Sequence, residues 1–243
     1  MSLQNVLSTL RKAVEEYEMI KAGDKICVGL SGGKDSVVLL TALKAYQRFS
    51  PQPFELGAIT IDMGIGNIDL SALTEYCEKL GVPYHIEKTE IGPIIFDVRK
   101  EKNPCSLCSK MRRGALNSAL IARGYNKLAL GHHADDVVET MLLSLMYEGR
   151  FSTFAPVSYM DRSGVTLIRP LIYTEEKNII PVARELPVCK HPCPANHETQ
   201  REYVKQLLKS ICKDVPCAKD RMFGAITHPE RNNLWDKYQK SDK

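Results

Sequence analysis

Short apolar runs alternate with longer amphipathic segments over the first 150 residues of the chain. Bounded by Gly, Pro or Asp, the apolar runs predict strands at 26–30, 54–61, 84–87 and 127–130. Helical spacing of apolar residues predicts helices over 3–20, 36–43, 68–80, 106–123 and 136–148. Strands that alternate with helices of this length indicate βαβ units. We therefore expect an α/β fold with a doubly wound parallel sheet.

Beyond residue 150 the pattern is weaker. A further strand is expected over 165–169, and helices are expected over 175–184 and 198–211. The chain has no internal repeat, and nothing in it demands a second independent domain. The organisation expected is an N-terminal helix (1–22), an α/β domain (23–185) and a C-terminal helical segment (186–243).

The turn after the first strand has the composition of a phosphate-binding site. A Ser-Gly-Gly turn between a strand and a helix directs backbone N–H groups toward an anion at the positive end of the helix dipole. Two adjacent glycines remove the Cβ atoms that would block a phosphate, and the serine, lysine and aspartate side chains add donors, charge and a carboxylate for Mg²⁺. The candidate nucleotide-binding residues here are Ser31, Gly32, Gly33, Lys34, Asp35 and Ser36.

This turn is not a Walker A loop. Gly29 and Gly33 are one residue too close for that motif, and Asp35 stands where the motif has a hydroxyl residue. A three-glycine dinucleotide fingerprint is also absent from the sequence. We therefore expect a triphosphate-binding turn that is neither a Walker A loop nor a dinucleotide fingerprint.

A second polar sequence, Gly-His-His-Ala-Asp-Asp, follows the fourth expected strand at 131–136. At the carboxyl edge of a parallel sheet, Gly131 and His132 would face the nucleotide. Asp135 and Asp136 suit Mg²⁺ held between ATP oxygens, although Asp135 equally suits a helix N-cap and the histidines equally suit packing. Asp62, at the end of the second strand, would face the same crevice or form a turn.

Eight cysteines in a chain without a secretory segment indicate metal or redox chemistry rather than a disulfide framework. Cys105 and Cys108 open a helix, where two thiolates three positions apart can face one metal. A second pair, Cys189 and Cys193, lies further along the chain. The spacing is compatible with a zinc site, with three cysteines that hold an iron–sulfur cluster, or with a redox-active Cys-x-x-Cys pair.

The composition, with 44% hydrophobic and 26% charged residues, is that of a soluble globular protein. No apolar run approaches the ~20 residues of a membrane span, and the N-terminus lacks a signal-peptide core, so we expect a cytoplasmic protein with no membrane partner. The net charge of +4 is small, but eight basic residues and one acidic residue lie between Arg99 and Lys127. This basic run fits a polyanion partner, or simply a solvated face.

The sequence Ser-Gly-Gly-Lys-Asp-Ser resembles the PP-loop of the N-type ATP pyrophosphatases. Within that superfamily the chain resembles the TtcA branch, the tRNA 2-thiocytidine synthetases. The matching segments are Leu-Ser-Gly-Gly-Lys-Asp-Ser (30–36), Cys-Ser-Leu-Cys-Ser-Lys-Met-Arg-Arg-Gly (105–114), Ala-Leu-Gly-His-His-Ala-Asp-Asp (129–136), Ile-Arg-Pro-Leu (168–171) and Cys-Pro-Ala-Asn (193–196). The resemblance spans nearly the whole chain.

The resemblance implies thiolation of tRNA that depends on ATP and Mg²⁺ and uses a [4Fe–4S] cluster. In that family the oxygen at C2 of a cytidine in the anticodon loop is replaced by sulfur. The sulfur donor would be sulfide or a persulfide-carrying protein, and a homodimer stays open. The basic run at 99–127 would then contact tRNA phosphates.

Carried over to this sequence, the resemblance implies that Cys105 and Cys108 are two of three cluster ligands. Cys193 is the favoured third ligand and Cys189 the alternative, because this chain has Cys-x-x-x-Cys spacing there. The resemblance also implies catalytic roles for four residues. Asp35 with Asp135 or Asp136 would hold Mg²⁺, and Arg112 would lie between the cluster and the phosphates.

Two other interpretations stay open from the residues. One is a PP-loop ligase or amidotransferase partner that modifies a tRNA base or nucleotide without a cluster. The other is a zinc-stabilised module that binds tRNA and ATP but performs no chemistry. The related TtuA branch has paired-cysteine zinc modules at both ends, and this sequence lacks cysteines before Cys27 and after Cys217, which favours the TtcA branch.

Overall fold

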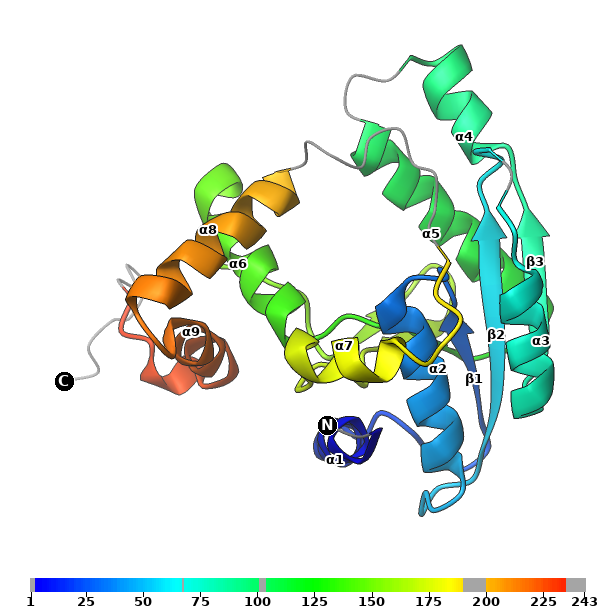
Figure 1. Ribbon diagram of the computed structural model, residues 1–243, viewed down its shortest axis with the longest axis horizontal. Coiled ribbons are helices and arrows are strands. Elements are labelled where there is room, and N and C mark those ends of the chain that lie inside the picture. The colour runs from blue at the N-terminus through cyan, green and yellow to red at the C-terminus, as the bar shows by residue number, and fades with distance from the viewer. Residues whose placement is uncertain (1–2, 67, 101–103, 190–199, 235–243) are drawn as a thin grey trace. The chain divides into compact units, whose positions relative to one another are not determined.

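The computed structural model of the protein describes residues 3–66, 68–100, 104–189 and 200–234. Strands and helices alternate along most of this length, as the ribbon diagram shows (Figure 1). The elements are α1 (Leu3–Glu16), β1 (Asp24–Gly29), α2 (Lys34–Gln47), β2 (Phe54–Asp62), α3 (Ser71–Leu80), β3 (Tyr84–Lys88), α4 (Ile91–Pro93), η1 (Ile94–Val98), α5 (Pro104–Ala122), β4 (Lys127–Ala129), α6 (Ala134–Glu148), β5 (Val157–Met160), β6 (Val165–Ile168), α7 (Glu176–Ala183), α8 (Gln200–Asp214), α9 (Ala218–Thr227) and η2 (Pro229–Arg231).

Within the described residues, six strands form one sheet in the order β3-β2-β1-β4-β6-β5. All neighbours pair in parallel except β5 and β6, which pair antiparallel with Val157 opposite Ile168. The chain moves outward from β1 through β2 to β3, and then crosses to the other side of β1 to form β4. The strand order therefore reverses between β1 and β4, which is the place where open α/β sheets bind ligands.

Helices cover both faces of the sheet (Figure 1). Right-handed crossovers require this, because α2 and α3 join strands that advance in one direction while α5 joins β3 to β4 in the opposite direction. On the α5 face, Leu116 and Leu120 pack with Cys27, Ile59 and other apolar residues of the sheet. On the other face, α2 has no exposed residue and contacts α1 and α7.

The expected fold class is confirmed, and each strand and helix expected from the sequence is present with shifts at its ends. The expected helix 3–20 ends at Glu16, for example, and the expected helix 68–80 begins at Ser71. Four features were missed: the helical segment α4–η1, the antiparallel edge strand β5, the helix α9 and the short helix η2. Each is short or lacks a clean apolar period, so a periodicity search has little to detect.

The chain divides into two compact units, Met1–Asp136 with Phe154–Thr199, and Val137–Thr153 with Gln200–Lys243. The first unit contains the whole sheet. The second has its own apolar cluster, in which Val138 and Leu142 of α6 pack with Val204 and Leu208 of α8. The domain boundaries expected at residues 22 and 185 stay predictions. None of the described helices has the length and apolar character needed to cross a bilayer.

A buried ion pair ties the first strand to the fourth at the amino edge of the sheet. The Nζ atom of Lys127 lies 2.6 Å from a carboxylate oxygen of Asp24 and donates to the carbonyl oxygen of Met19 at 2.7 Å. Burial opposes ionisation of Asp24, but hydrogen bonds from Lys127, from the Lys21 N–H and from Asn126 outweigh it and lower its pKa. The pair therefore fixes the segment between α1 and β1 onto the sheet.

The variant Asp24→Asn would leave the Lys127 ammonium buried without its counter-ion. We expect the free energy of unfolding at pH 7 to fall by about 3 kcal/mol or more, measured by urea denaturation. Because the pKa of Asp24 is lowered in the folded state, the wild-type advantage is present above the unfolded-state pKa of about 3.9 and is lost as pH falls through the folded-state value.

The matched control is Glu55→Gln, which breaks the exposed pair between Lys25 and Glu55 on neighbouring strands (N···O 3.3 Å). Exposed pairs contribute less than about 1 kcal/mol, so this variant should unfold close to wild type. Equal stability of Asp24→Asn and wild type at pH 7 would show that the buried pair contributes nothing.

Candidate active site at the carboxyl edge of the sheet

The turn at residues 31–36 is held by its own serines. The Ser31 and Ser36 hydroxyl oxygens lie 3.1 Å apart, and Ser36 Oγ accepts from the Ser31 N–H (3.2 Å) and donates to the Gly33 carbonyl oxygen (2.9 Å). Gly32 has φ of +80°, a left-handed conformation that glycine adopts without strain. Gly33 is the N-cap of α2, and no side chain caps that helix end. The backbone N–H groups of the first turn of α2 are therefore presented at this edge.

Gly131, at the end of β4, touches the backbone of this turn. A Cβ atom there would lie 2.9 Å from the carbonyl carbon and oxygen of Asp35 and 3.0 Å from the nitrogen of Ser36. Real Cβ atoms do not approach backbone so closely, so only glycine fits without displacing the start of α2. This contact places the turn after β4 directly against the turn after β1.

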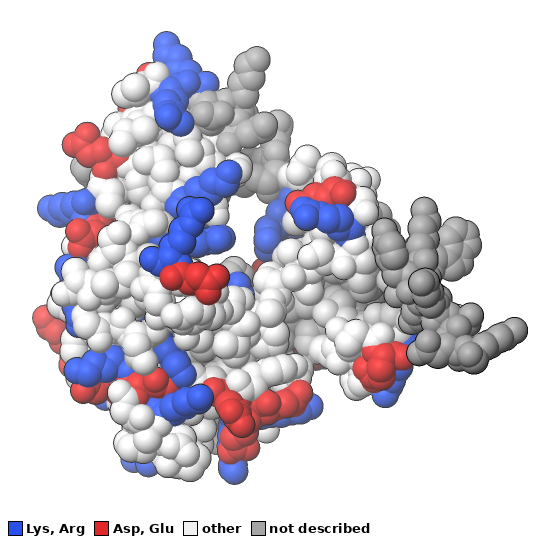
Figure 2. All heavy atoms as spheres, turned by 180° about the vertical axis from the view of Figure 1, so that it is seen from behind, with Lys and Arg blue, Asp and Glu red and all other residues white. Residues whose placement is uncertain are grey.

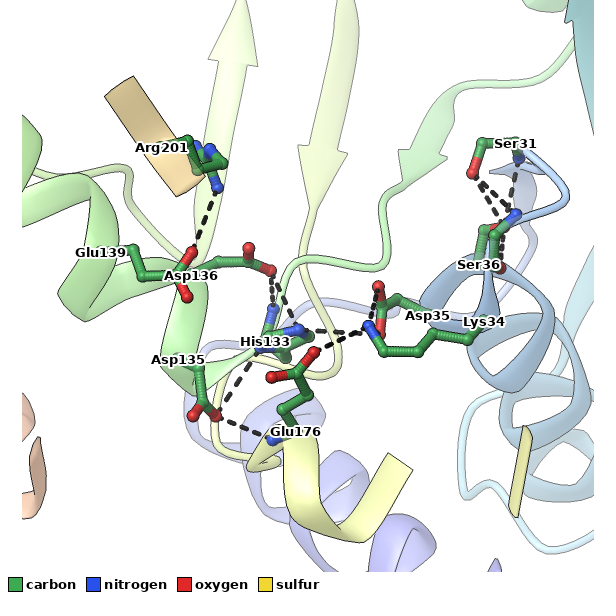
Figure 3. Close-up of polar contacts among 11 residues, drawn as sticks. Ser31, Lys34, Asp35, Ser36, His133, Asp135, Asp136, Glu139, Glu176 and Arg201 are labelled. Atoms are coloured by element: carbon green, nitrogen blue, oxygen red, sulfur yellow. Dashed lines mark hydrogen bonds and ion pairs between the residues drawn. The ribbon is translucent and has the colours of Figure 1, made fainter. Parts of the chain in front are cut away.

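The side chains of both turns converge on His133, which is 4% exposed (Figure 3). Its Nε2 atom lies 3.6 Å from Asp35 Oδ1 and 3.5 Å from Asp136 Oδ2, and its Nδ1 atom lies 3.8 Å from Asp135 Oδ2. Asp136 Oδ2 also accepts from the His133 N–H at 3.0 Å, as a residue in the first turn of α6 can. The three aspartates expected to be functional are thus brought together around one imidazole.

Lys34 is held by two carboxylates. Its Nζ atom lies 3.0 Å from Asp35 and 3.0 Å from Glu176 Oε1, in the first turn of α7. Burial works against the charge of Lys34, but the two carboxylates outweigh it and raise the pKa of the ammonium. The Glu176 N–H in turn donates to Asp135 Oδ2 at 2.8 Å. Glu176 therefore links both turns, although sequence reasoning missed it because no local pattern marks it.

Three other expected residues lie apart from this cluster. Asp62 Oδ1 accepts from the Gly64 N–H at 3.0 Å, which is the turn-forming role left open from the sequence. The His132 ring packs against Phe154 with centroids 4.9 Å apart. Arg112 is exposed on α5, and no contact joins it to the 31–36 turn in the part of the chain that the structure describes.

The cysteines expected to bind metal are placed in two groups. Cys105 is exposed at the start of α5, and Cys108 is half-buried with its sulfur 3.5 Å from Met63 Sδ. Cys189 is tied to the 31–36 turn, because its N–H donates to the Gly32 carbonyl oxygen at 2.9 Å. Burial and Asp69 raise the pKa of its thiol. Cys193 lies outside the described residues. In the part of the chain that the structure describes, no group of three Cys, His, Asp or Glu side chains is placed to hold a metal ion.

The comparison with known families agrees with this geometry. Residues 3–217 match the PP-loop domain family. The chain belongs to the PP-loop family. A protein named tRNA-cytidine(32) 2-sulfurtransferase from Citrifermentans bemidjiense is 38% identical over 231 residues, which cover 93% of this chain and 91% of the relative. A protein of the same name from Geobacter sulfurreducens is 37% identical over 238 residues, which cover 96% and 93%. The resemblance to the TtcA branch is confirmed.

The fold is also shared with solved structures. The U34-tRNA thiolase NcsA from Methanococcus maripaludis, solved with its [4Fe-4S] cluster, matches with a TM-score of 0.74 at 26% identity over 96% of this chain and 80% of that one. An NAD+ synthetase from Burkholderia pseudomallei matches with a TM-score of 0.52 at 14% identity, which shows a shared fold alone. We use the name PP-loop for the turn at residues 31–36, because its sequence Ser-Gly-Gly-Lys-Asp-Ser resembles that motif and the chain belongs to the PP-loop family.

The residues of the PP-loop region fit a nucleotide with Mg²⁺. The contact at Gly131 fixes the start of α2, whose first N–H groups no side chain caps, and Lys34 supplies a cation in the first turn of that helix. Mg²⁺ in nucleotide sites takes one or two protein carboxylates and completes its shell with phosphate oxygens and water, so the absence of a three-ligand group among the described residues is no obstacle. Asp35 with Asp135 or Asp136 stays the predicted pair of carboxylates for it.

The variant Gly131→Ala should separate the two turns. The added Cβ meets backbone rather than a flexible side chain, so the start of α2 must shift. We expect a folded protein whose affinity for ATP falls about tenfold or more, since a lost phosphate contact of ~1.4 kcal/mol gives that factor. The measurement is ATP titration by isothermal calorimetry, with circular dichroism to verify folding.

Gly224→Ala is the control for Gly131→Ala. Gly224 lies inside α9, where an added Cβ meets nothing within 4 Å, so alanine should leave ATP affinity unchanged. An unchanged ATP affinity of Gly131→Ala would contradict the assignment of this contact.

Proposed function

We propose that this protein is a tRNA sulfurtransferase that forms 2-thiocytidine in the anticodon loop at the expense of ATP. The single observation that carries the proposal is the junction of the PP-loop with the 131–136 turn, where the Gly131 contact assembles Lys34 and the aspartates. The names of the curated relatives and of the NcsA structure support tRNA as the substrate class and sulfur transfer as the reaction.

The first step proposed is adenylation of the base. The N–H groups at the start of α2, with the Ser31 and Ser36 hydroxyls, would bind the phosphates of ATP. The C2 oxygen of the cytidine attacks the α-phosphorus, an O–P bond forms, and the bond to the leaving pyrophosphate breaks. Lys34 would balance the negative charge that grows on the pyrophosphate. Mg²⁺, when bound by Asp35 with Asp136 or Asp135, would supply further neutralisation of the phosphates.

Glu176 and His133 give these groups their orientation. The Glu176 carboxylate pairs with Lys34 of the PP-loop, and the Glu176 N–H donates to Asp135 of the 131–136 turn. Glu176 therefore holds these two turns in position relative to each other. His133 separates Asp35 from Asp136, two carboxylates that would otherwise repel at close range. An arriving phosphate with its cation replaces these internal partners with ligand contacts. The site therefore has its charges arranged before the substrate binds.

The second step is sulfur transfer. Hydrosulfide sulfur adds at C2 of the adenylated base, the C2–O bond breaks, and AMP leaves with the former carbonyl oxygen. A [4Fe–4S] cluster, when bound, would supply a Lewis-acidic iron for the sulfur. Cys105 and Cys108 suit two of its ligands, since residues three apart on α5 share one face and the exposed Cys105 is accessible. Cys193 or Cys189 would be the third.

The part of the basic run at 99–127 that lies on α5 is proposed to contact tRNA. Its described members Lys110, Arg112 and Arg113 lie on the same helix as Cys105 and Cys108. The expectation is wrong for Lys127, which is buried in the ion pair with Asp24, and Arg123 pairs with Glu87. In the space-filling view, several Lys and Arg side chains stand close together in the middle of the face, with an acidic side chain directly beside them (Figure 2). Sulfide or a persulfide-carrying protein as donor, a homodimer and a cytoplasmic location stay proposals.

Asp35→Asn should stop the first step. The neutral amide keeps the size of the side chain but removes the carboxylate proposed to hold Mg²⁺, so formation of AMP and pyrophosphate from ATP in the presence of tRNA should fall by about 100-fold or more. Thin-layer chromatography of radiolabelled ATP measures both products. Asp220→Asn in α9 is the control and should match wild type. Wild-type AMP formation by Asp35→Asn would contradict the PP-loop assignment.

Cys108→Ala should separate the two steps. This variant should lose thiolated nucleoside entirely while ATP affinity stays within about twofold of wild type, because the cysteine lies outside the PP-loop. Mass spectrometry of nucleosides from tRNA incubated with anaerobically purified protein gives the yield, and absorbance near 400 nm reports the cluster. Cys217→Ala, at an exposed cysteine of the second unit, is the matched control.

This experiment also tests the competing functions. A cluster-free PP-loop ligase would give a modified base without sulfur from both wild type and Cys108→Ala. A binding module without chemistry would leave the tRNA nucleosides unchanged and release no pyrophosphate. Normal 2-thiocytidine yield from Cys108→Ala would exclude a role of this cysteine.

A further inference from the structure

Arg169 is a buried cation at the carboxyl edge of the sheet. It follows β6 directly, and the preceding residue, Ile168, accepts through its carbonyl oxygen from the Leu130 N–H at 3.0 Å. This hydrogen bond places Arg169 beside the end of β4, where Gly131 and His132 follow. The whole residue is only 9% exposed. Nothing in the mechanism above uses it.

One nitrogen of the guanidinium anchors the side chain. Nη1 donates to the Ala155 carbonyl oxygen and lies 3.4 Å from Ser158 Oγ. The Cζ atom lies 4.7 Å from the centre of the Phe154 ring, whose other contact is the His132 ring. The Nε atom is shielded from solvent and has no hydrogen-bond acceptor among the residues that the structure describes. Among the described residues, no hydrogen bond involves the Nε–Nη2 edge, which is the edge that forms paired hydrogen bonds to oxyanions.

The charge of Arg169 is uncompensated as well. Within the described ranges, no carboxylate lies at ion-pair distance from it. Burial, and then the positive charge of Arg113 on α5, lower the pKa of Arg169 to about 10, so the group is still charged at neutral pH. Burying a cation without a counter-ion is unfavourable unless another group compensates it. Two neighbouring arginines without an acid between them have the charge of an oxyanion site.

We propose that Arg169 and Arg113 together bind a phosphate group of the RNA backbone beside the target nucleotide. The inference rests on the proposed function, because it takes tRNA as the substrate. Arg169 would form the fixed, bidentate half of the site, and the exposed Arg113 would close on the phosphate from α5. This contact would hold the target strand between the PP-loop and the helix that carries Cys105 and Cys108.

The position favours RNA over the phosphates of ATP. The PP-loop follows β1, and β4 lies between β1 and β6, so the strand ends that carry the PP-loop and Arg169 are about 10 Å apart at normal strand spacing. The phosphates of ATP already have Lys34, two hydroxyls and the α2 N-terminus. Arg113, by contrast, belongs to α5 and its basic run. A polynucleotide that enters along α5 would bring a phosphate to this point.

The test measures the affinity of the full-length protein for tRNA over a series of salt concentrations. Arg113→Gln removes the exposed charge, and Arg169→Lys keeps a charge but loses the bidentate edge. We expect each variant to bind tRNA about tenfold more weakly at low salt, with ATP affinity unchanged. Arg113→Gln should also lower the slope of log affinity against log salt by ~0.7–0.9, the value for one lost phosphate contact.

Arg162→Gln is the matched control, since Arg162 is exposed in the turn between β5 and β6 and faces neither arginine in the contacts described. A purely structural Arg169 would lower the melting temperature of Arg169→Lys without changing its tRNA affinity, and this result overturns the proposal. If Arg169→Lys does not fold, Arg113→Gln decides alone through its salt slope.

Three further outcomes are distinguishable. Loss of ATP affinity with retained tRNA affinity would assign the phosphate to the nucleotide and overturn the RNA assignment. Wild-type protein that thiolates tRNA, with both variants binding tRNA normally at every salt concentration, would overturn this inference but leave the proposed function intact. Wild-type protein that neither binds nor thiolates tRNA would overturn both.

Discussion

The close approach of two backbones at Gly131 is the constraint on which the rest of the site depends. A parallel sheet whose strand order reverses leaves a crevice between the two central strands, and here those strands are β1 and β4. Usually such a crevice separates the two following turns. In this protein the missing side chain of Gly131 lets the turn after β4 rest on the first residues of α2. Lys34, Asp35, His133 and Asp136 therefore share a site that neither turn could form alone.

The electrostatics follow from that contact. At this distance the carboxylates of Asp35 and Asp136 repel each other. The His133 ring lies between them, and the Lys34 ammonium lies beside Asp35. Glu176 adds a further negative charge from α7, yet it also extends the network to a third element. The outcome is a cluster of internally paired charges, and under the proposed function a phosphate and a divalent cation would replace the internal partners. Such a replacement would need little reorganisation of the protein. Charges that are arranged in advance stabilise the charge that develops during phosphoryl transfer.

Much of the fold could be predicted from the sequence, because the central strands are continuous apolar runs and the helices between them have a clear period. The PP-loop was also predictable, since Gly32 and Gly33 stand between a strand and a helix. The edge strand β5 was not, because its residues are half-exposed and follow Pro156. Segment α4–η1 contains Pro93, a residue that argues against a helix when read locally. The roles of Glu176 and Arg169 could not be predicted for a different reason. Their partners depend on tertiary packing, and the periodicity of apolar residues carries no information about it.

At the carboxyl edge of the sheet, the sign of the charged side chains depends on which strand they follow. After β1 and β4 the described acidic groups, Asp35, Asp135 and Asp136, have cationic, imidazole or N–H partners. After β6 the sign is reversed, and Arg169 remains without a described acid. A site that handled only a nucleotide would gain nothing from a buried cation two strands away from its phosphates. A site that must hold a nucleotide and a second polyanion at once needs separate positive charge for each. The sorting of charge therefore matches two anionic substrates that meet over β4.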